Sequence, residues 1–229
     1  MNTRNIVAII PASGVGSRMK ADRPKQYLRL LNKTILEHTL DIFLSHPEIS
    51  KVIVAVSPED PYYQEIDLLK SEKIKVVFGG ETRAKSVYNA LKCLSSNDWA
   101  LVHDAARPCL KRSDLDNLLQ INDEQGAILA TPAIDTIKRA NGLQISHTED
   151  RETLWHALTP QFFPAKPLTE ALEAAFLANA TITDEASAME FAGFHPTLVA
   201  GRSDNLKITR PEDLTLAEFY LTHQTENNS

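Results

Sequence analysis

Short apolar runs alternate with helical patterns along most of this chain, and that alternation constrains its fold more than any other feature. The runs are rich in Val, Ile and Leu and end at turn residues, as buried strands do. They occupy residues 6–10, 52–56, 75–78, 99–102 and 127–130. Strands that alternate with helices predict a mostly parallel sheet with helices on both faces.

Between and after these runs, apolar residues recur at the three- and four-residue spacing of a helix. Helices are predicted at residues 35–44, 83–94, 115–121, 168–178 and 184–192, with one more strand at 197–199. Pro211 is expected to open a last helix, because proline suits the first helical turn. The 229 residues contain no visible repeat or linker, so one domain spanning residues 1–229 is expected.

A hairpin is predicted in the stretch that follows Pro132. Two roughly alternating segments, 136–140 and 143–147, flank Asn141-Gly142, which favours a type I′ turn with positive φ at both central residues. An isolated two-stranded hairpin is only marginally stable in water, so this one must pack against something. Physics alone leaves the chain's own sheet and a partner chain equally open as that support.

The composition restricts the partners of the protein. A formal net charge of −6 argues against a nucleic-acid partner, although a few local cations suffice to bind a small anion. Cys93 and Cys109 have the spacing of neither a zinc site nor a redox pair, and such cysteine usage is typical of a reducing compartment. The apolar run at 6–10 is too short for a signal peptide or a membrane span. A cytoplasmic protein without a membrane partner is therefore expected.

The first candidate site is the glycine-containing loop at residues 11–18, directly after the first predicted strand. Gly14 and Gly16 let backbone amides approach a ligand closely, and such amides bind anions. The loop has neither the third glycine of a dinucleotide fingerprint nor the Gly-Lys-Ser/Thr of a P-loop. By itself it could be a tight turn, but Arg18 and Lys25 close by indicate a triphosphate site.

Two further candidate sites follow the third and fourth predicted strands. Gly80 again permits close backbone approach, and Arg83 lies one helical turn before Ser86, so both could face a ligand. The alternative is an ordinary strand-to-helix turn with a surface arginine. Asp104 lies at the carboxyl end of its strand, where ligands of open α/β sheets collect, and could hold Mg²⁺ directly or through water. It could instead cap the next element or pair with Arg107.

In combination, these motifs resemble those of the 2-C-methyl-D-erythritol 4-phosphate cytidylyltransferase family. The resemblance extends roughly over residues 6–221. Its motifs are Pro-Ala-Ser-Gly-Val-Gly-Ser-Arg at 11–18, Pro-Lys-Gln-Tyr at 24–27, Gly-x-x-Arg-x-x-Ser at 80–86, His-Asp-Ala-Ala-Arg-Pro at 103–108, Trp-His-Ala-Leu-Thr-Pro-Gln at 155–161, Ala-Thr-Ile-Thr-Asp-Glu-Ala-Ser at 180–187 and Asn-Leu-Lys-Ile-Thr at 205–209. The glycine-containing loop alone is shared by many nucleotidyltransferases, whereas the ordered set is specific.

The resemblance implies a function and a fold. It implies transfer of CMP from CTP to 2-C-methyl-D-erythritol 4-phosphate with release of pyrophosphate, in isoprenoid precursor biosynthesis, with Mg²⁺ or another divalent cation. It implies an α/β, Rossmann-like three-layer nucleotidyltransferase fold with a mostly parallel mixed sheet and a protruding β-hairpin arm. It also implies a homodimer, in which the arm at about residues 133–152 reaches the neighbouring subunit.

Residue roles follow from the resemblance position by position. Arg18 and Lys25 match the pair that stabilises charge at the α-phosphate. The nucleotide-binding positions are Ala12, Ser13, Gly14, Gly16, Gly80, Glu81, Arg83 and Ser86. The positions around the acceptor phosphate and polyol are Asp104, Arg107, Thr136, Arg151, Thr159, Thr183 and Lys207, of which Asp104 also faces the metal, directly or through water.

Two positions depart from the family pattern, and two other functions stay open. Ser13 stands where alanine is common and Glu81 where aspartate is common, which leaves the side-chain role of Glu81 undefined. A cytidylyltransferase for another polyol phosphate, such as ribitol 5-phosphate, would share the fold and the CTP site. A non-catalytic nucleotide-binding regulator would not need Arg18, Lys25 and Asp104 together. A second catalytic activity is not expected.

Overall fold

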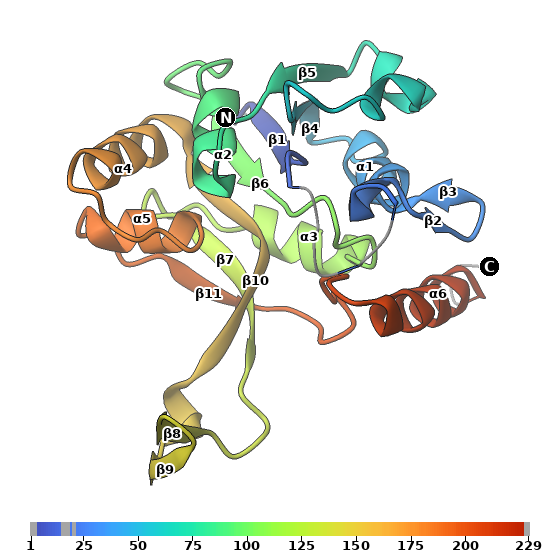
Figure 1. Ribbon diagram of the computed structural model, residues 1–229. Helices are drawn as coiled ribbons and strands as arrows, with labels where there is room; N and C mark the ends of the chain where they lie inside the picture. The colour runs from blue at the N-terminus through green and yellow to red at the C-terminus, as the bar shows by residue number, and fades with distance from the viewer. Residues whose placement is uncertain (1–3, 15–18, 20–21, 227–229) are drawn as a thin grey trace.

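The computed structural model of this chain describes residues 4–14, 19 and 22–226, and these residues build a seven-stranded sheet (Figure 1). The strand order is β11-β7-β10-β6-β1-β4-β5. The strands are β1 (Ile6–Pro11), β4 (Ile49–Val56), β5 (Ile74–Phe78), β6 (Trp99–Val102), β7 (Ala127–Pro132), β10 (Trp155–Pro164) and β11 (Thr197–Ala200). All neighbours run parallel except β10, which is antiparallel to both β6 and β7. The predicted mostly parallel mixed sheet is confirmed.

Helices cover both faces of this sheet, which confirms the three-layer arrangement (Figure 1). One layer contains α2 (Arg83–Leu91), α4 (Ala165–Leu177) and α5 (Glu185–Phe191); the other contains α1 (Ile35–Leu44) and α3 (Arg112–Leu119). Side chains of a strand point alternately to the two faces. In β1, Val7 and Ile9 pack with the first layer, whereas Ile6, Ala8 and Ile10 pack with the second. Central strands buried on both faces therefore show continuous apolar runs.

The helix ends follow local capping. Helix α1 has the predicted bounds, because Thr34 and Glu37 form a reciprocal capping box at its start. Helix α2 ends at Leu91, three residues before the predicted end at 94. Its apolar pattern continues, but the chain tightens there into turns with Cys93 N bonded to Ala90 O at 3.0 Å. Cys93 is consequently exposed, whereas Cys109 is buried.

Strand β10 was not predicted, although it is the longest strand of the sheet. It contains Pro160 and ends at Pro164, and prolines argue against a central strand because they cannot donate a ladder hydrogen bond. The structure accommodates Pro160 at an irregularity, where the pairing with β7 shifts between Ala157 and Gln161.

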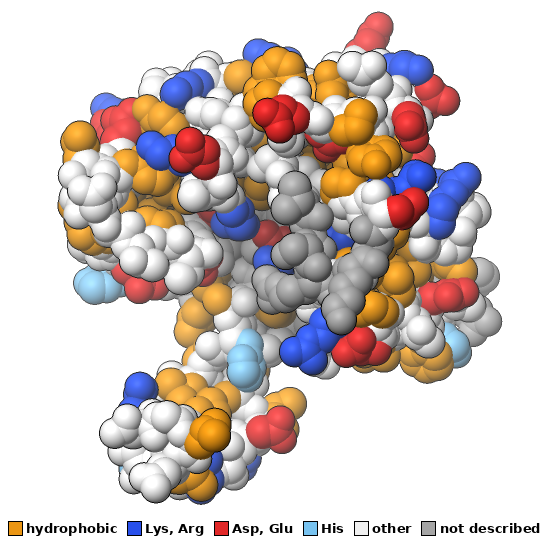
Figure 2. Space-filling view, viewed as in Figure 1, with side chains coloured by type: hydrophobic (Ala, Val, Ile, Leu, Met, Phe, Trp, Pro, Cys, Tyr) orange, Lys and Arg blue, Asp and Glu red, His pale blue; other side chains and the backbone are white. Residues whose placement is uncertain are grey.

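The predicted hairpin is present as β8 (Lys138–Asn141) and β9 (Gln144–Thr148), which project from the body as an arm (Figures 1 and 2). The predicted type I′ turn over Asn141-Gly142 is wrong. Asn141 pairs with Gln144, so the loop is Gly142-Leu143, and positive φ occurs only at Gly142, as in a type II′ turn. A register shift between Arg139 and Ala140 also changes the pairing by one residue within the hairpin.

The remaining elements lie outside the seven-stranded sheet. A small sheet of β2 (Arg29–Leu30) and β3 (Lys33–Thr34) packs beside α6 (Pro211–Glu226), which opens at Pro211 as predicted. Short 3₁₀ turns are η2 (Lys25–Tyr27), η3 (Tyr63–Glu65), η4 (Asp67–Lys70) and η5 (Arg151–Thr153). Within the described ranges, every helix is too short or too polar to cross a membrane.

Candidate active site

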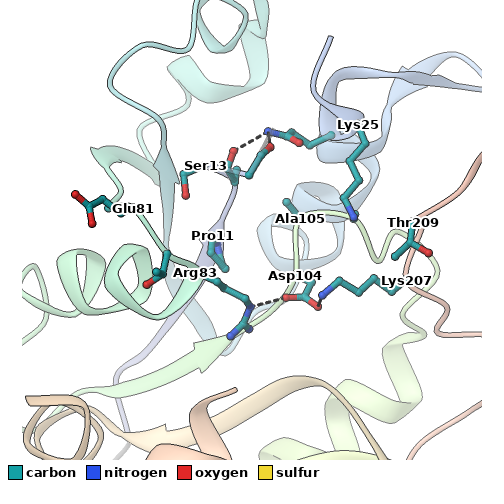
Figure 3. Close-up of a pocket in the computed structure, with 15 residues that line it drawn as sticks. Pro11, Ser13, Lys25, Glu81, Arg83, Asp104, Ala105, Lys207 and Thr209 are labelled. Atoms are coloured by element: carbon teal, nitrogen blue, oxygen red, sulfur yellow. Dashed lines mark hydrogen bonds and ion pairs between the residues drawn. The ribbon is translucent and has the colours of Figure 1, made fainter. Parts of the chain in front are cut away.

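An open pocket of about 350 Å³ lies at the carboxyl ends of β1 and β6 and beside the β5–α2 turn (Figure 3). Three separate stretches that the sequence singled out meet there: residues 12–14, 80–83 and 104–106. Lys25 enters from η2, and Lys207 and Thr209 enter from the segment before α6. This is the sheet edge at which open α/β folds bind their ligands.

The glycine-containing loop forms one side of the pocket with Ala12, Ser13 and Gly14. Gln26, which is 3% exposed, donates from Nε2 to Ala12 O at 2.7 Å and to Gly14 O at 3.2 Å. Gln26 thus fixes the backbone of the loop, a role that was not predicted although Gln26 stands in the motif at 24–27. The predicted residues Gly16 and Arg18 lie outside the described residues.

The Gly79-Gly80 turn forms the neighbouring side of the pocket, and the side chain of Ser86 is hydrogen-bonded to this turn. Ser86 Oγ accepts from Gly80 N at 3.0 Å and lies 2.7 Å from Ser13 Oγ, so the two loops are joined. A Cβ at Gly79 would lie 2.7 Å from Ser86 Oγ, so any other residue there would displace the hydroxyl that joins the two loops. Ser86 itself is fully buried and supports the turn, whereas Gly80 and the exposed Glu81 line the pocket.

Asp104 lies between three cations, Arg83, Arg107 and Lys207, of which Figure 3 shows Arg83 and Lys207. Its Oδ1 accepts from Arg83 Nε at 2.9 Å and its Oδ2 from Lys207 Nζ at 2.8 Å, while Arg107 Nε lies 3.5 Å from Oδ2. Burial raises the pKa of Asp104, but the three cations outweigh it and hold that pKa well below its usual value. The carboxylate therefore stays ionised at neutral pH.

Arg83 joins Asp104 to a second buried carboxylate, Glu185, which was not predicted as a site residue. Its Nη1 and Nη2 donate to the two oxygens of Glu185 at 2.7 and 3.0 Å, while its Nε donates to Asp104. Burial lowers the pKa of Arg83, and the two carboxylates more than reverse the effect, so its pKa is raised. Arg83, predicted to contact the nucleotide, lines the pocket with its guanidinium held by two carboxylates.

A buried network behind Asp104 fixes the loop that carries it. His103 contacts Arg107 O through Nε2 at 2.9 Å and Thr159 Oγ1 through Nδ1 at 3.0 Å, and Asp104 N donates to the same hydroxyl at 3.2 Å. Burial lowers the pKa of His103 to about 4, so the ring is neutral at pH 7. Its Nε2–H then donates to Arg107 O, and the Thr159 hydroxyl donates to Nδ1. Thr159, predicted near the acceptor, has its side chain in this network.

The other predicted acceptor residues are distributed differently. Lys207 lines the pocket, and Arg107 is buried behind Asp104 and donates to Asn205 O at 2.6 Å. Thr183 is exposed before α5. Thr136 and Arg151 are exposed at the base of the arm, where Arg151 donates to Ile134 O, and they do not line this pocket within the chain.

The arrangement suits a phosphate-bearing ligand, because backbone amides and the ammonium groups of Lys25 and Lys207 meet around one open volume. Among the described residues, no group of three or more His, Cys, Asp or Glu side chains is placed to hold a metal ion. The acidic side chains that line the pocket are Glu81 and Asp104, and Asp104 already faces three cations. This donor set fits a divalent cation only where ligand phosphates and water complete its coordination.

Comparison with known proteins gives concordant similarities. The family model for 2-C-methyl-D-erythritol 4-phosphate cytidylyltransferase matches residues 6–223. The chain is 70% identical to the enzyme of that name from Actinobacillus pleuropneumoniae serotype 7 (strain AP76), over 98% of this chain and 99% of the relative. It is 63% identical to that of Haemophilus influenzae (strain 86-028NP), over 96% and 98%. The crystal structure of the Francisella tularensis enzyme, 38% identical, superposes with a TM-score of 0.81 over 94% of this chain and 99% of that one.

Proposed function

Since this chain belongs to the 2-C-methyl-D-erythritol 4-phosphate cytidylyltransferase family, it transfers CMP from CTP to that acceptor in isoprenoid precursor biosynthesis, and we propose that the pocket is where the transfer occurs. The observation that carries this proposal is the meeting of the glycine-containing loop, the Gly79-Gly80 turn and Asp104 around one volume. The cysteine usage, two residues whose spacing suits neither a zinc site nor a redox pair, supports a reducing compartment, the cytoplasm, as its location.

The nucleotide is proposed to bind between the two glycine-containing segments. Ala12, Ser13 and Gly14 offer backbone groups on one side, and Gly80 and Glu81 on the other. Lys25 faces the space between them and Asp104, where its charge would stabilise the α-phosphate (Figure 3). We assign the same task to Arg18, on the evidence of its motif.

The acceptor is proposed to bind on the side of Asp104 and Lys207. Its phosphate oxygen attacks the α-phosphorus of CTP in line, the new P–O bond forms, and the bond to pyrophosphate breaks. Two anions must meet, so positioning and charge neutralisation carry most of the catalysis. Lys207 suits this task because its side chain is 41% exposed while its ammonium group is held by Asp104.

A Mg²⁺ ion, when bound, would neutralise the triphosphate and orient it for attack. We propose that phosphate oxygens supply most of its ligands and that Asp104 contributes through a water molecule. Asp104 suits this role because its carboxylate is ionised at neutral pH and lines the pocket.

We propose that residues 1–229 form one domain and that the arm, residues 133–152, joins two copies into a homodimer. The arm exposes apolar side chains that its own chain leaves uncovered: Ile134 is 74% exposed, Leu143 104% and Ile145 67% (Figure 2). A twofold dimer would bury both arms symmetrically. Arg151, at the base of the arm, would then be available to bind the acceptor phosphate in the neighbouring pocket with its planar guanidinium.

The assigned specificity predicts which substrates are turned over. In a coupled pyrophosphate-release assay, CTP with 2-C-methyl-D-erythritol 4-phosphate should react faster than CTP with ribitol 5-phosphate, and faster than ATP with the same acceptor. A higher kcat/KM for ribitol 5-phosphate would assign the enzyme to the other polyol phosphate. Binding of CTP without turnover of any acceptor would indicate a regulator.

A shared active site predicts complementation between inactive subunits. Lys25→Ala chains and Arg151→Ala chains should each be nearly inactive, and their mixture should recover about a quarter of wild-type activity, because half the dimers are mixed and each has one intact site. The control mixes Lys25→Ala chains with Lys207→Ala chains. Both residues line the pocket of their own chain, so each site of a mixed dimer lacks one of them and no activity should be recovered. The mixed dimers are verified with two affinity tags. If they form but show no recovered activity, Arg151 does not serve the active site of the neighbouring subunit.

A further inference from the structure

Glu185 is a buried carboxylate that lies behind the pocket without lining it. Only 1% of Glu185 is exposed, and both of its oxygens accept from the guanidinium of Arg83. Burial raises its pKa, and the two contacts with Arg83 oppose that rise. A buried ionised pair of this kind is weak evidence for stability by itself, so its position next to the reaction site requires an explanation.

The backbone that carries Glu185 is fixed to the central sheet. Gln161, on β10, donates to Asp184 Oδ2 at 2.8 Å and accepts from Ala186 N at 2.9 Å, so it holds the residues on either side of Glu185. Asp184 also caps the start of α5. Glu185 is therefore an anchored acceptor, and the position of the Arg83 guanidinium depends on it.

A continuous line of contacts runs from this anchor into the pocket. Glu185 takes both terminal nitrogens of Arg83, which leaves Nε to bind Asp104 Oδ1. Asp104 Oδ2 thereby remains available to Lys207 Nζ at 2.8 Å. Two carboxylates, Asp104 and Glu185, face three cations, Arg83, Arg107 and Lys207, which gives a net charge of +1 next to the acceptor side.

Without the Glu185 charge, the terminal nitrogens of Arg83 would be free to form a forked pair with both oxygens of Asp104. Lys207 would then compete for Oδ2 and lose its fixed position. We propose that Glu185 is a positioning residue: it restrains Arg83 so that Asp104 holds Lys207 ready for the acceptor phosphate. This inference rests on the proposed acceptor side of the pocket, and it specifies how that side is organised.

A positioning role and a purely structural role differ in what they do to the two Michaelis constants. We expect Glu185→Gln to raise KM for 2-C-methyl-D-erythritol 4-phosphate about tenfold, a common size of coupling within one charged network, and to leave KM for CTP within about twofold. In an Asp104→Asn background the same change should add little. Glu190→Gln, on the exposed face of α5, is the matched control and should alter neither constant.

A second variant covers the case in which Glu185→Gln does not fold. Arg83→Met with Glu185→Leu removes both charges, and apolar replacement of a buried pair is often neutral for stability. It should also raise the acceptor KM selectively. A folded variant of either kind with a wild-type acceptor KM, or with equal losses for both substrates, overturns the positioning role alone. Wild-type protein that fails to turn over CTP with the acceptor overturns the proposed function as well.

Discussion

We expect Lys25→Ala to lower turnover on the order of 10²–10³-fold, the usual loss when one donor to a transition state is removed. Lys25 enters the pocket from η2 and reaches toward the segment that carries Lys207 and Thr209 (Figure 3), where a compact positive charge suits the phosphate that reacts. Its Nζ donates to Ile208 O at 2.7 Å, and loss of that hydrogen bond should cost about 1.5 kcal/mol of stability. Steady-state pyrophosphate release measures the first effect and thermal melting the second.

The control for this substitution is Lys51→Ala, because Lys51 is exposed on β4 and does not line the pocket. Turnover of that variant should stay near the wild-type rate. A correctly folded Lys25→Ala protein with near-normal turnover would show that Lys25 does not stabilise the transition state.

We expect Arg83→Ala to lower the free energy of unfolding by about 3–5 kcal/mol, the usual cost of leaving a buried charge without its partner. The guanidinium is the ionic partner of Glu185 and one of three cations at Asp104, and both carboxylates are buried. Urea unfolding at pH 7 followed by circular dichroism measures the change, with the slope checked for two-state behaviour.

The control for Arg83→Ala is Arg112→Ala. Arg112 Nε lies 3.2 Å from Asp116 Oδ1 in a pair that is about half exposed on both sides, so its loss should cost less than about 1 kcal/mol. Equal losses for the two variants would mean that the buried network around Arg83 contributes no more to stability than a surface pair.

The fold could be predicted wherever strands are buried on both faces. The run at 6–10 reads as one apolar block because Val7 and Ile9 face one helical layer and Ile6, Ala8 and Ile10 the other. Strand β10 was not predicted because Pro160 is a strand-breaking signal. In the structure, Pro160 lies where the pairing with β7 is irregular, so the strand continues through it. The hairpin was found, but its two-residue loop, Gly142-Leu143, lies one residue later than the Asn141-Gly142 signal indicates.

Site residues that directly follow strands could be predicted from the sequence. Residues whose role depends on a contact with a distant part of the chain could not. Gly80 and Asp104 follow strands directly, so the topology alone brings them to one edge. Glu185 and Gln26 belong to the site because of contacts with distant residues. Glu185 binds Arg83, 102 positions away, and Gln26 binds the loop after β1. Both residues stand within the family motifs at 24–27 and 180–187, and their place in those motifs is the signal that could have identified them.

Strand β10 connects the arm to the reaction site within ten residues. Its first residues follow η5 at the base of the arm, Thr159 supports the Asp104 backbone, and Gln161 anchors the start of α5. Side chains of a strand alternate between the two faces of the sheet. One residue inserted into β10 before Thr159 would therefore turn the side chains of Thr159 and Gln161 to the opposite face. Length variation in this part of the chain should therefore be confined to the Gly142-Leu143 loop, where an insertion lengthens the arm and leaves the spacing of Thr159 and Gln161 unchanged.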